Sequence, residues 1–185
     1  MNIRPDVPRP ARGEDGLLLA LAVIAGGFAG VAVAGFRLAI DWSSRLLLGA
    51  HLRPHSLSLL IVPCLTGLVI AGLTMHLFPA SRRSGVNQTK AALYLHGGYL
   101  SLRSAVGKFV TAALAIGSGQ SLGPEDPALH IGAAIGSWLG RHGGLGGERR
   151  GLMAPVGAAA GLAAAFGAPV SAVLFVIEEI TGGWS

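Results

Sequence analysis

The chain has 185 residues, of which 51% are hydrophobic and 12% are charged, which is about half the charged share of a typical soluble domain. Glycine supplies 29 residues, and both glycine and proline are commoner in membrane helices than in soluble ones. The net charge is +5, but the basic residues lie between apolar runs and form no single stripe, which argues against a nucleic-acid partner and indicates an integral membrane protein.

The N-terminal half contains two long apolar runs. Residues 1–15 are polar, basic and proline-rich, and they predict a mobile arm. Residues 16–36 carry no charge over a length that is sufficient to cross a bilayer as a helix. Residues 37–55 are mixed, and residues 57–78 form a second uncharged run. We therefore predict two membrane-spanning helices after the arm.

The apolar runs that follow are short or are broken by glycine and proline. They cover residues 109–122, 128–140 and 152–177. Helical runs of about 13 residues are too short for a hydrocarbon core of about 30 Å. Helix ends at membrane depth are tolerated only inside protein or beside a water-filled cavity, as in transporters with broken helices. The sequence thus predicts an all-α, polytopic membrane protein with long and short, broken helices.

Glycines four residues apart recur in these runs. The pairs are Gly26/Gly30, Gly132/Gly136 and Gly157/Gly161. Small residues at this spacing let membrane helices approach closely. We predict that each pair lies at a helix contact.

A short acidic segment, Pro124-Glu125-Asp126-Pro127, stands between two apolar runs. Asp126 before Pro127 is typical of a helix start, because Asp is a favoured N-cap and Pro is favoured at the first helical position. Glu125 is left without that explanation. A helix N-terminus attracts anions, so a carboxylate there competes with an incoming anion unless it moves or takes a proton. Glu125 is therefore a candidate gate and proton acceptor, with a second capping acid as the alternative.

Three segments within residues 82–180 carry a further pattern. They read RRSGVNQTKAALY, then GSGQSLGPEDPALHIGAAIGSWLGR, then GAAAGLAAAFGAPVSAVLFVIEEI. In this order they resemble the G-S-G-I-P loop, the G-[RK]-E-G-P motif and the A-A-x-F-x-A-P segment with paired glutamates of the CLC family of chloride channels and proton-coupled chloride antiporters. The resemblance implies chloride transport across a membrane, without a cofactor. A membrane enzyme has no support, since no nucleophile–base pair or metal-ligand cluster is evident.

The resemblance also implies roles for individual residues. Ser84 would offer its hydroxyl to a bound chloride, and Gly85 and Val86 their backbone N–H groups. Glu125 would be the external gating glutamate. Glu179 would be the internal proton glutamate, which favours an antiporter over a voltage-gated channel.

Other readings of these residues stay open. Lys108 lies 17 residues before Glu125, a spacing that resembles a buried lysine of prokaryotic members, but it could also snorkel at an interface. Glu179 could simply mark the emergence of its helix into water. A Ser-Gly pair such as Ser84-Gly85 is usually only a turn.

The motifs depart from the family pattern at several positions. Pro124 replaces a basic residue and Asp126 replaces a glycine, so the segment loses a cation and gains an anion. This change lowers the positive potential at the anion site unless Asp126 is used in capping or is protonated. Asn87 replaces a proline and could donate its amide to an anion. Chloride is the expected ion, with nitrate or another small anion as alternatives.

The family fold consists of two inverted halves, and residues 16–185 resemble the N-terminal half. No second copy of the motifs follows, so we expect a fragment or truncated product whose transport is incomplete without the other half. The alternative is a non-conducting scaffold. The expected partners are chloride, protons, the lipid bilayer and a second copy in a homodimer, and the expected location is a prokaryotic inner or plasma membrane.

Overall fold

The computed structural model describes residues 12–49 and 57–182, which form helices and connecting loops without a strand among them. The helices are α1 (Arg12–Leu48), α2 (Ser58–His76), α3 (Gly85–Leu95), α4 (Leu102–Gly117), α5 (Glu125–His142), α6 (Gly147–Phe166) and α7 (Pro169–Phe175). A 3₁₀ segment, η1 (Pro79–Arg82), precedes α3, and one π-helical turn, η2 (Val176–Ile180), follows α7. The predicted all-α class is confirmed.

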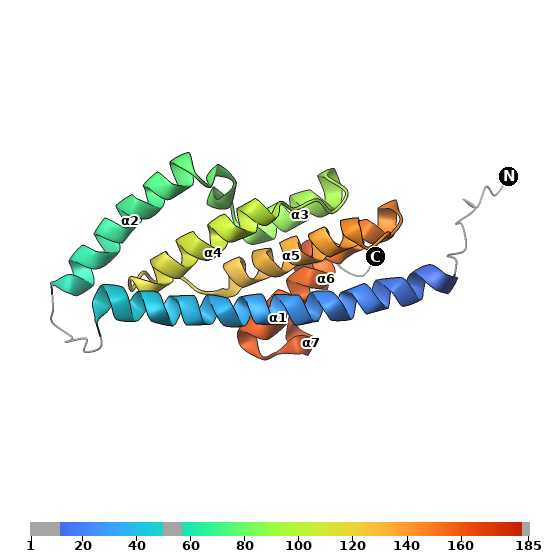
Figure 1. Cartoon of the computed structure of the whole chain (residues 1–185), viewed down its shortest axis with the longest axis horizontal. Helices are drawn as coiled ribbons and strands as arrows, with labels where there is room; N and C mark the ends of the chain where they lie inside the picture. Colours follow the sequence, from blue (N-terminus) through green and yellow to red (C-terminus); the bar gives the residue numbers. More distant parts are fainter. Residues whose placement is uncertain (1–11, 50–56, 183–185) are drawn as a thin grey trace.

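Helix α1 is longer than the sequence predicted. It begins at Arg12 rather than residue 16, and it continues through the mixed segment to Leu48. Residues 12–15, which we placed in the mobile arm, are therefore helical, whereas residues 1–11 lie outside the described residues. Acids in the first turn favour a helix start, and Asp15 also pairs with Arg149 of α6 at 2.9 Å. The 37 residues of α1 extend about 55 Å, along the length of the molecule (Figure 1).

The two predicted membrane spans are helices of sufficient length and apolarity to cross a membrane, α1 and α2. Both present large apolar side chains outward: Val23 and Val31 of α1 are 76% and 74% exposed, and Leu60 and Leu68 of α2 are 69% and 72% exposed. Exposing so many large apolar side chains to water is unfavourable, so these faces fit lipid or other protein surfaces.

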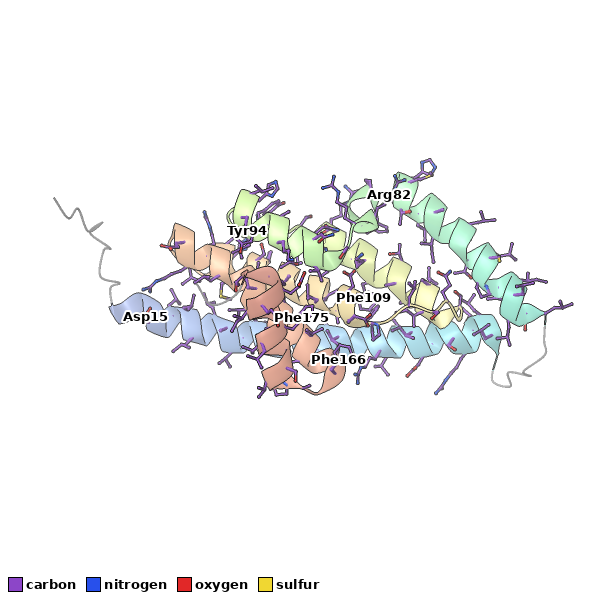
Figure 2. All side chains as sticks on the ribbon, turned by 180° about the vertical axis from the view of Figure 1, so that it is seen from behind. Asp15, Arg82, Tyr94, Phe109, Phe166 and Phe175 are labelled. Atoms are coloured by element: carbon purple, nitrogen blue, oxygen red, sulfur yellow. The ribbon has the colours of Figure 1, made fainter. Side chains whose placement is uncertain are left out.

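Helix α5 lies in the centre of the bundle, in contact with α1, α3, α4 and α6 (Figure 1). Its buried residues run from Pro127 to Gly140, with the exception of Ile135 and Trp138. In Figure 2 the α6–α7 corner, with Phe166 and Phe175, lies on the face opposite to that of Figure 1. The short helices α4 and α5, of 16 and 18 residues, extend about 24 and 27 Å.

The glycine pairs of α5 and α6 make the closest helix contact. A Cβ added to Gly132 would collide with the carbonyl oxygen of Gly157, and one added to Gly157 would collide with the carbonyl of Gly132. These two pairs lie at a contact as predicted. The prediction is wrong for Gly26/Gly30, where an added Cβ meets nothing within 4 Å among the described residues, so these positions face outward or toward longer side chains.

Helices α6 and α7 meet at a sharp corner. Helix α6 ends at Phe166. The C-cap residue Gly167 has a φ of 66°, in the left-handed region that favours glycine, and Pro169 then begins α7. Pro155 lies inside α6 without ending it. The apolar run 152–177 is therefore two helices and a π-helical turn, as the predicted broken helices require.

Candidate anion-binding site

The turn that leads into α3 is held by two side chains from outside it. The amide nitrogen of Gln88 donates to the carbonyls of Ala80 and Arg83, both at 3.0 Å. The ammonium of Lys108, from α4, donates to the carbonyl of Arg83 at 2.8 Å. These bonds fix the position of Ser84, the N-cap residue of α3, whose ψ of 137° is extended.

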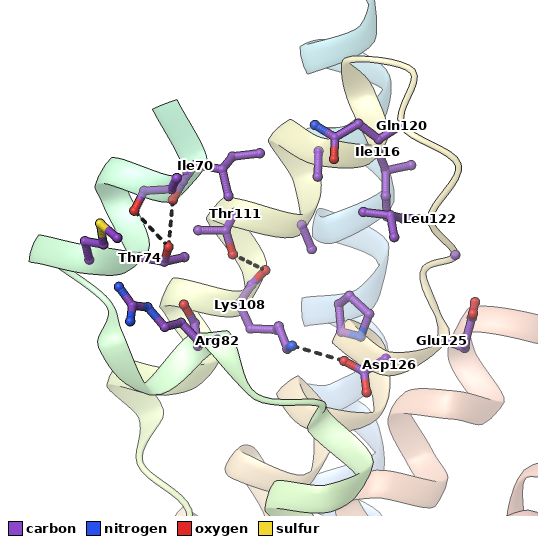
Figure 3. A pocket seen from close by; sticks show the side chains of 17 residues that line it. Ile70, Thr74, Arg82, Lys108, Thr111, Ile116, Gln120, Leu122, Glu125 and Asp126 are labelled. Carbon is purple, nitrogen blue, oxygen red and sulfur yellow. Dashed lines mark hydrogen bonds and ion pairs between the residues drawn. The ribbon is translucent and has the colours of Figure 1, made fainter. Parts of the chain in front are cut away.

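The first polar groups of α3 converge on one carboxylate oxygen of α5. Asp126 Oδ1 accepts hydrogen bonds from the hydroxyl of Ser84 at 2.8 Å, from the N–H of Gly85 at 2.7 Å and from the N–H of Val86 at 3.3 Å. Its second oxygen, Oδ2, pairs with the Lys108 ammonium at 3.1 Å (Figure 3). The three groups that the resemblance assigned to an anion thus bind an anionic oxygen that belongs to the protein itself.

Asp126 does not cap its own helix, in contrast to our prediction. Helix α5 begins one residue earlier, at Glu125, with Pro124 at the N-cap position and without a side-chain cap. Asp126 instead caps α3. Hydrogen bonds from a hydroxyl and two N–H groups, together with an ammonium, stabilise a carboxylate better than the N–H groups of its own first turn alone.

Gly85 allows α3 to approach α5 closely. A Cβ at Gly85 would lie 2.6 Å from the Asp126 carbonyl oxygen and 2.7 Å from Cβ of His130. His130 is fully buried, and its Nε2 lies 3.0 Å from the hydroxyl of Ser104 on α4. The anion-binding donors therefore stand against the first two turns of α5 because residue 85 has no side chain.

We expect Gly85→Ala to lower the free energy of unfolding by about 1–3 kcal/mol, because backbone and a buried side chain must shift to admit the methyl group. The measurement is unfolding in detergent followed by helical circular dichroism. Gly72→Ala in α2 is the control, since a Cβ there meets none of the described residues within 4 Å and Ala favours a helix. Equal stabilities of the two variants would contradict this account of Gly85.

A cavity of about 740 Å³ opens beside the Asp126–Lys108 pair (Figure 3). It lies between α2, η1, α4 and the start of α5, and its polar lining includes two cations and two acids. The charged lining residues are Arg82, Lys108, Glu125 and Asp126. An ion in this cavity would therefore reach the carboxylate of Asp126 before it reached the donors of α3.

Glu125 does not lie at the donors of α3. Its side chain is exposed, folds back over Gly123, and points away from Asp126 (Figure 3). No hydrogen bond or ion pair joins it to another of the described residues. It also lines a second, apolar cavity of about 550 Å³ beside Phe166 and Phe175. The sequence assigned Glu125 a gating role at the start of its own helix, and the structure places the carboxylate of its neighbour, Asp126, at the donors of α3.

Glu179 lies in η2 and forms an ion pair with Lys90 of α3 at 2.5 Å, with 46% of the Glu179 side chain exposed. Lys90 was missed by the sequence analysis, although it belongs to the same segment as Ser84. Nothing in the sequence connects two residues 89 positions apart. Helix α3 thus carries the anion donors at its start and the partner of Glu179 about 7.5 Å further along.

The structure places Lys108, for which burial and snorkelling were both open, and Asn87 in different surroundings. Lys108 does not snorkel outward: its side chain is 12% exposed and bonds to Asp126 and Arg83. Asn87 does not line the cavity of Lys108 and Asp126, but a different pocket together with Arg83. The buried His130–Ser104 pair was also not anticipated, and the apolar context of His130 gave no signal for it.

Comparison with known proteins gives a consistent result. The sequence model for "Voltage gated chloride channel" matches residues 66–185. Chloride channel protein CLC-d of Arabidopsis thaliana is 39% identical over 124 residues, covering 57% of this chain and 15% of the relative. The H(+)/Cl(-) exchange transporter ClcA of Citrobacter koseri is 31% identical over 170 residues, covering 88% of this chain and 36% of the relative.

The structure resembles a crystal structure of a slow cyanobacterial Cl⁻/H⁺ antiporter, with a TM-score of 0.72 and 30% identity over 89% of this chain and 40% of the antiporter chain. The chain therefore spans well under half the length of these relatives. The family match, the fold and the two candidate spans agree that this is a membrane protein. The chain belongs to the voltage gated chloride channel family.

Proposed function

We propose that this chain takes part in chloride transport across a membrane, coupled to protons, and that residues 16–185 form one of the two halves of the transport unit. The observation that carries the proposal is the convergence of the Ser84 hydroxyl and the N–H groups of Gly85 and Val86 on one anionic oxygen. Donors that stabilise a carboxylate at a helix N-terminus also fit a halide ion.

The cavity supports the same function. Arg82 and Lys108 in its lining offset the charges of Glu125 and Asp126, and the cavity adjoins the carboxylate that occupies the α3 donors. The names of two of the relatives, an exchange transporter and an antiporter, support proton coupling in particular.

Two acidic side chains, Glu125 and Glu179, carry the transported proton in this proposal. Glu125 lines the cavity and has no partner among the described residues, so it is accessible to a proton from that side. Glu179 lies on η2 and is bound to Lys90. A proton that neutralises Glu179 would release Lys90, which connects protonation of η2 with the helix that carries the anion donors.

The location and the assembly are part of the proposal. A prokaryotic inner or plasma membrane is supported by the coverage of this chain, which is 88% for the bacterial relative and 57% for the plant one. The homodimer implied by the resemblance stays a prediction, and the mass of the detergent-solubilised particle measures it.

The test is chloride efflux and proton uptake in proteoliposomes that contain the 185-residue chain. We expect two copies of the unaltered chain to supply both halves and to carry both movements. Glu125→Gln and Glu179→Gln should retain chloride efflux and lose proton uptake, because glutamine cannot carry a proton. Glu178→Gln is the matched control: its side chain is exposed and adjacent to Glu179, and we expect no change.

The second candidate function is a non-conducting scaffold. It is favoured by the apolar outward faces of α1 and α2, which can pack against other membrane helices. Absence of chloride efflux from vesicles whose protein has the full helical dichroism would support the scaffold and contradict transport by this chain alone.

A further inference from the structure

We propose that Asp126 is a built-in competitor for the transported anion: its carboxylate occupies the donors of α3, and chloride binds only when Asp126 moves aside. The role of Asp126 rests on the proposed function, because it requires that these donors bind an external anion. It differs from the role assigned to Glu125, whose side chain points to another side of the cavity (Figure 3).

The geometry allows only one occupant at a time. Oδ1 takes all three donors, at 2.7 to 3.3 Å, so no donor of this group is left for a second anion. Two negative charges at a separation of about 4 Å also repel each other strongly where water is scarce. An incoming chloride must therefore replace Oδ1 at the N-terminus of α3.

The surroundings of Asp126 provide a place for the displaced carboxylate. Oδ2 already pairs with Lys108, and the Asp126 side chain is 31% exposed toward the adjoining cavity. Lys108 itself is fixed by its bond to the Arg83 carbonyl. A rotation of the Asp126 side chain into the cavity gives up the three α3 donors and retains the ion pair with Lys108.

A purely structural cap is the competing account of Asp126, and charge separates the two. Asparagine caps helices about as well as aspartate, since its amide oxygen accepts the same hydrogen bonds. An asparagine at position 126 would therefore preserve the cap. Because its amide is neutral, chloride would displace it from the three α3 donors more easily than it displaces a carboxylate.

The experiment is calorimetric titration of chloride into the detergent-solubilised 185-residue chain, in a buffer with gluconate as the only anion. The proteins are the unaltered chain, Asp126→Asn and Asp126→Ala. We expect chloride to bind both variants about tenfold more tightly, because the apparent affinity of the unaltered chain is scaled down by the small fraction of molecules whose donors are free of Asp126. Adding Ser84→Ala to Asp126→Asn removes one donor, and we expect it to weaken binding again.

The possible outcomes separate the two proposals. Equal affinities in all three proteins would leave the anion site in place and overturn the competitor role. Weaker binding by the variants would make Asp126 a structural support and would also overturn it. Folded proteins that bind no chloride would overturn the anion site and, with it, the proposed function.

A measurement on the unaltered chain covers the case in which both variants fail to fold. Displacement of Asp126 changes the hydrogen bonds of one carboxylate, so we expect chloride to shift a carboxylate band in the infrared difference spectrum. An unchanged carboxylate region at chloride concentrations that saturate the calorimetric signal would overturn the competitor role.

Discussion

Gly157→Ala is expected to lower the free energy of unfolding by about 3 kcal/mol, at the upper end of the usual effect of overpacking. A methyl group at residue 157 would collide with the carbonyl of Gly132 and approach the backbone of Gly136. Backbone cannot move aside as a flexible side chain can, so the two central helices α5 and α6 would have to separate. Unfolding in detergent, followed by helical circular dichroism, measures the effect.

The matched control for Gly157→Ala is Gly26→Ala in α1. Both glycines lie inside helices, so both substitutions gain the same helix propensity, but a Cβ at Gly26 has no atom within 4 Å in the part of the chain that the structure describes. We expect Gly26→Ala to be neutral or slightly stabilising. A loss below about 1 kcal/mol for Gly157→Ala would contradict the close contact of α5 and α6.

Lys108→Met is expected to lower the free energy of unfolding by about 2 kcal/mol, because it leaves the Asp126 carboxylate without its ion-pair partner. The value is below that for a fully buried pair, since 31% of the Asp126 side chain is exposed. Methionine retains the apolar length of lysine but cannot bond to the Arg83 carbonyl. The same detergent unfolding measures the change.

A double-mutant cycle tests whether the effect comes from the pair. We expect Lys108→Met combined with Asp126→Asn to be less destabilised than the sum of the two single variants, because the unpaired charge is then absent. Lys90→Met is the control, since the Lys90–Glu179 pair is exposed at 36% and 46%, and exposed pairs contribute about 0–1 kcal/mol. Strict additivity of the cycle would show that Lys108 acts independently of Asp126.

Much of the fold could be predicted from the sequence. Hydropathy located the two long helices, and interrupted apolar runs located the shorter ones, because both signals act within a window of about 20 residues. The boundaries were less accurate. Helix α1 extends to Arg12 and Leu48, since no glycine or proline interrupts the mixed residues 37–48 and a charged residue is compatible with a helix.

The candidate site was predicted in part. The resemblance assigned Ser84, Gly85 and Val86 to a bound anion, whereas Glu125 was predicted to gate, and Asp126 to cap, the start of their own helix. The contact of Asp126 with the three donors was not predicted. Successive residues at the start of a helix point in directions about 100° apart. A one-residue difference therefore decides which acid reaches the donors, and the sequence pattern does not resolve it.

The sequence by itself determined that this is a helical membrane protein of the chloride channel family, because apolar length and the order of three motifs are properties of the linear chain. Only the tertiary structure decided which charges meet: Asp126 lies 42 residues from Ser84, and Glu179 lies 89 from Lys90. These pairs form because glycines let α3, α5 and α6 pack backbone against backbone, and that packing sets the position of each carboxylate.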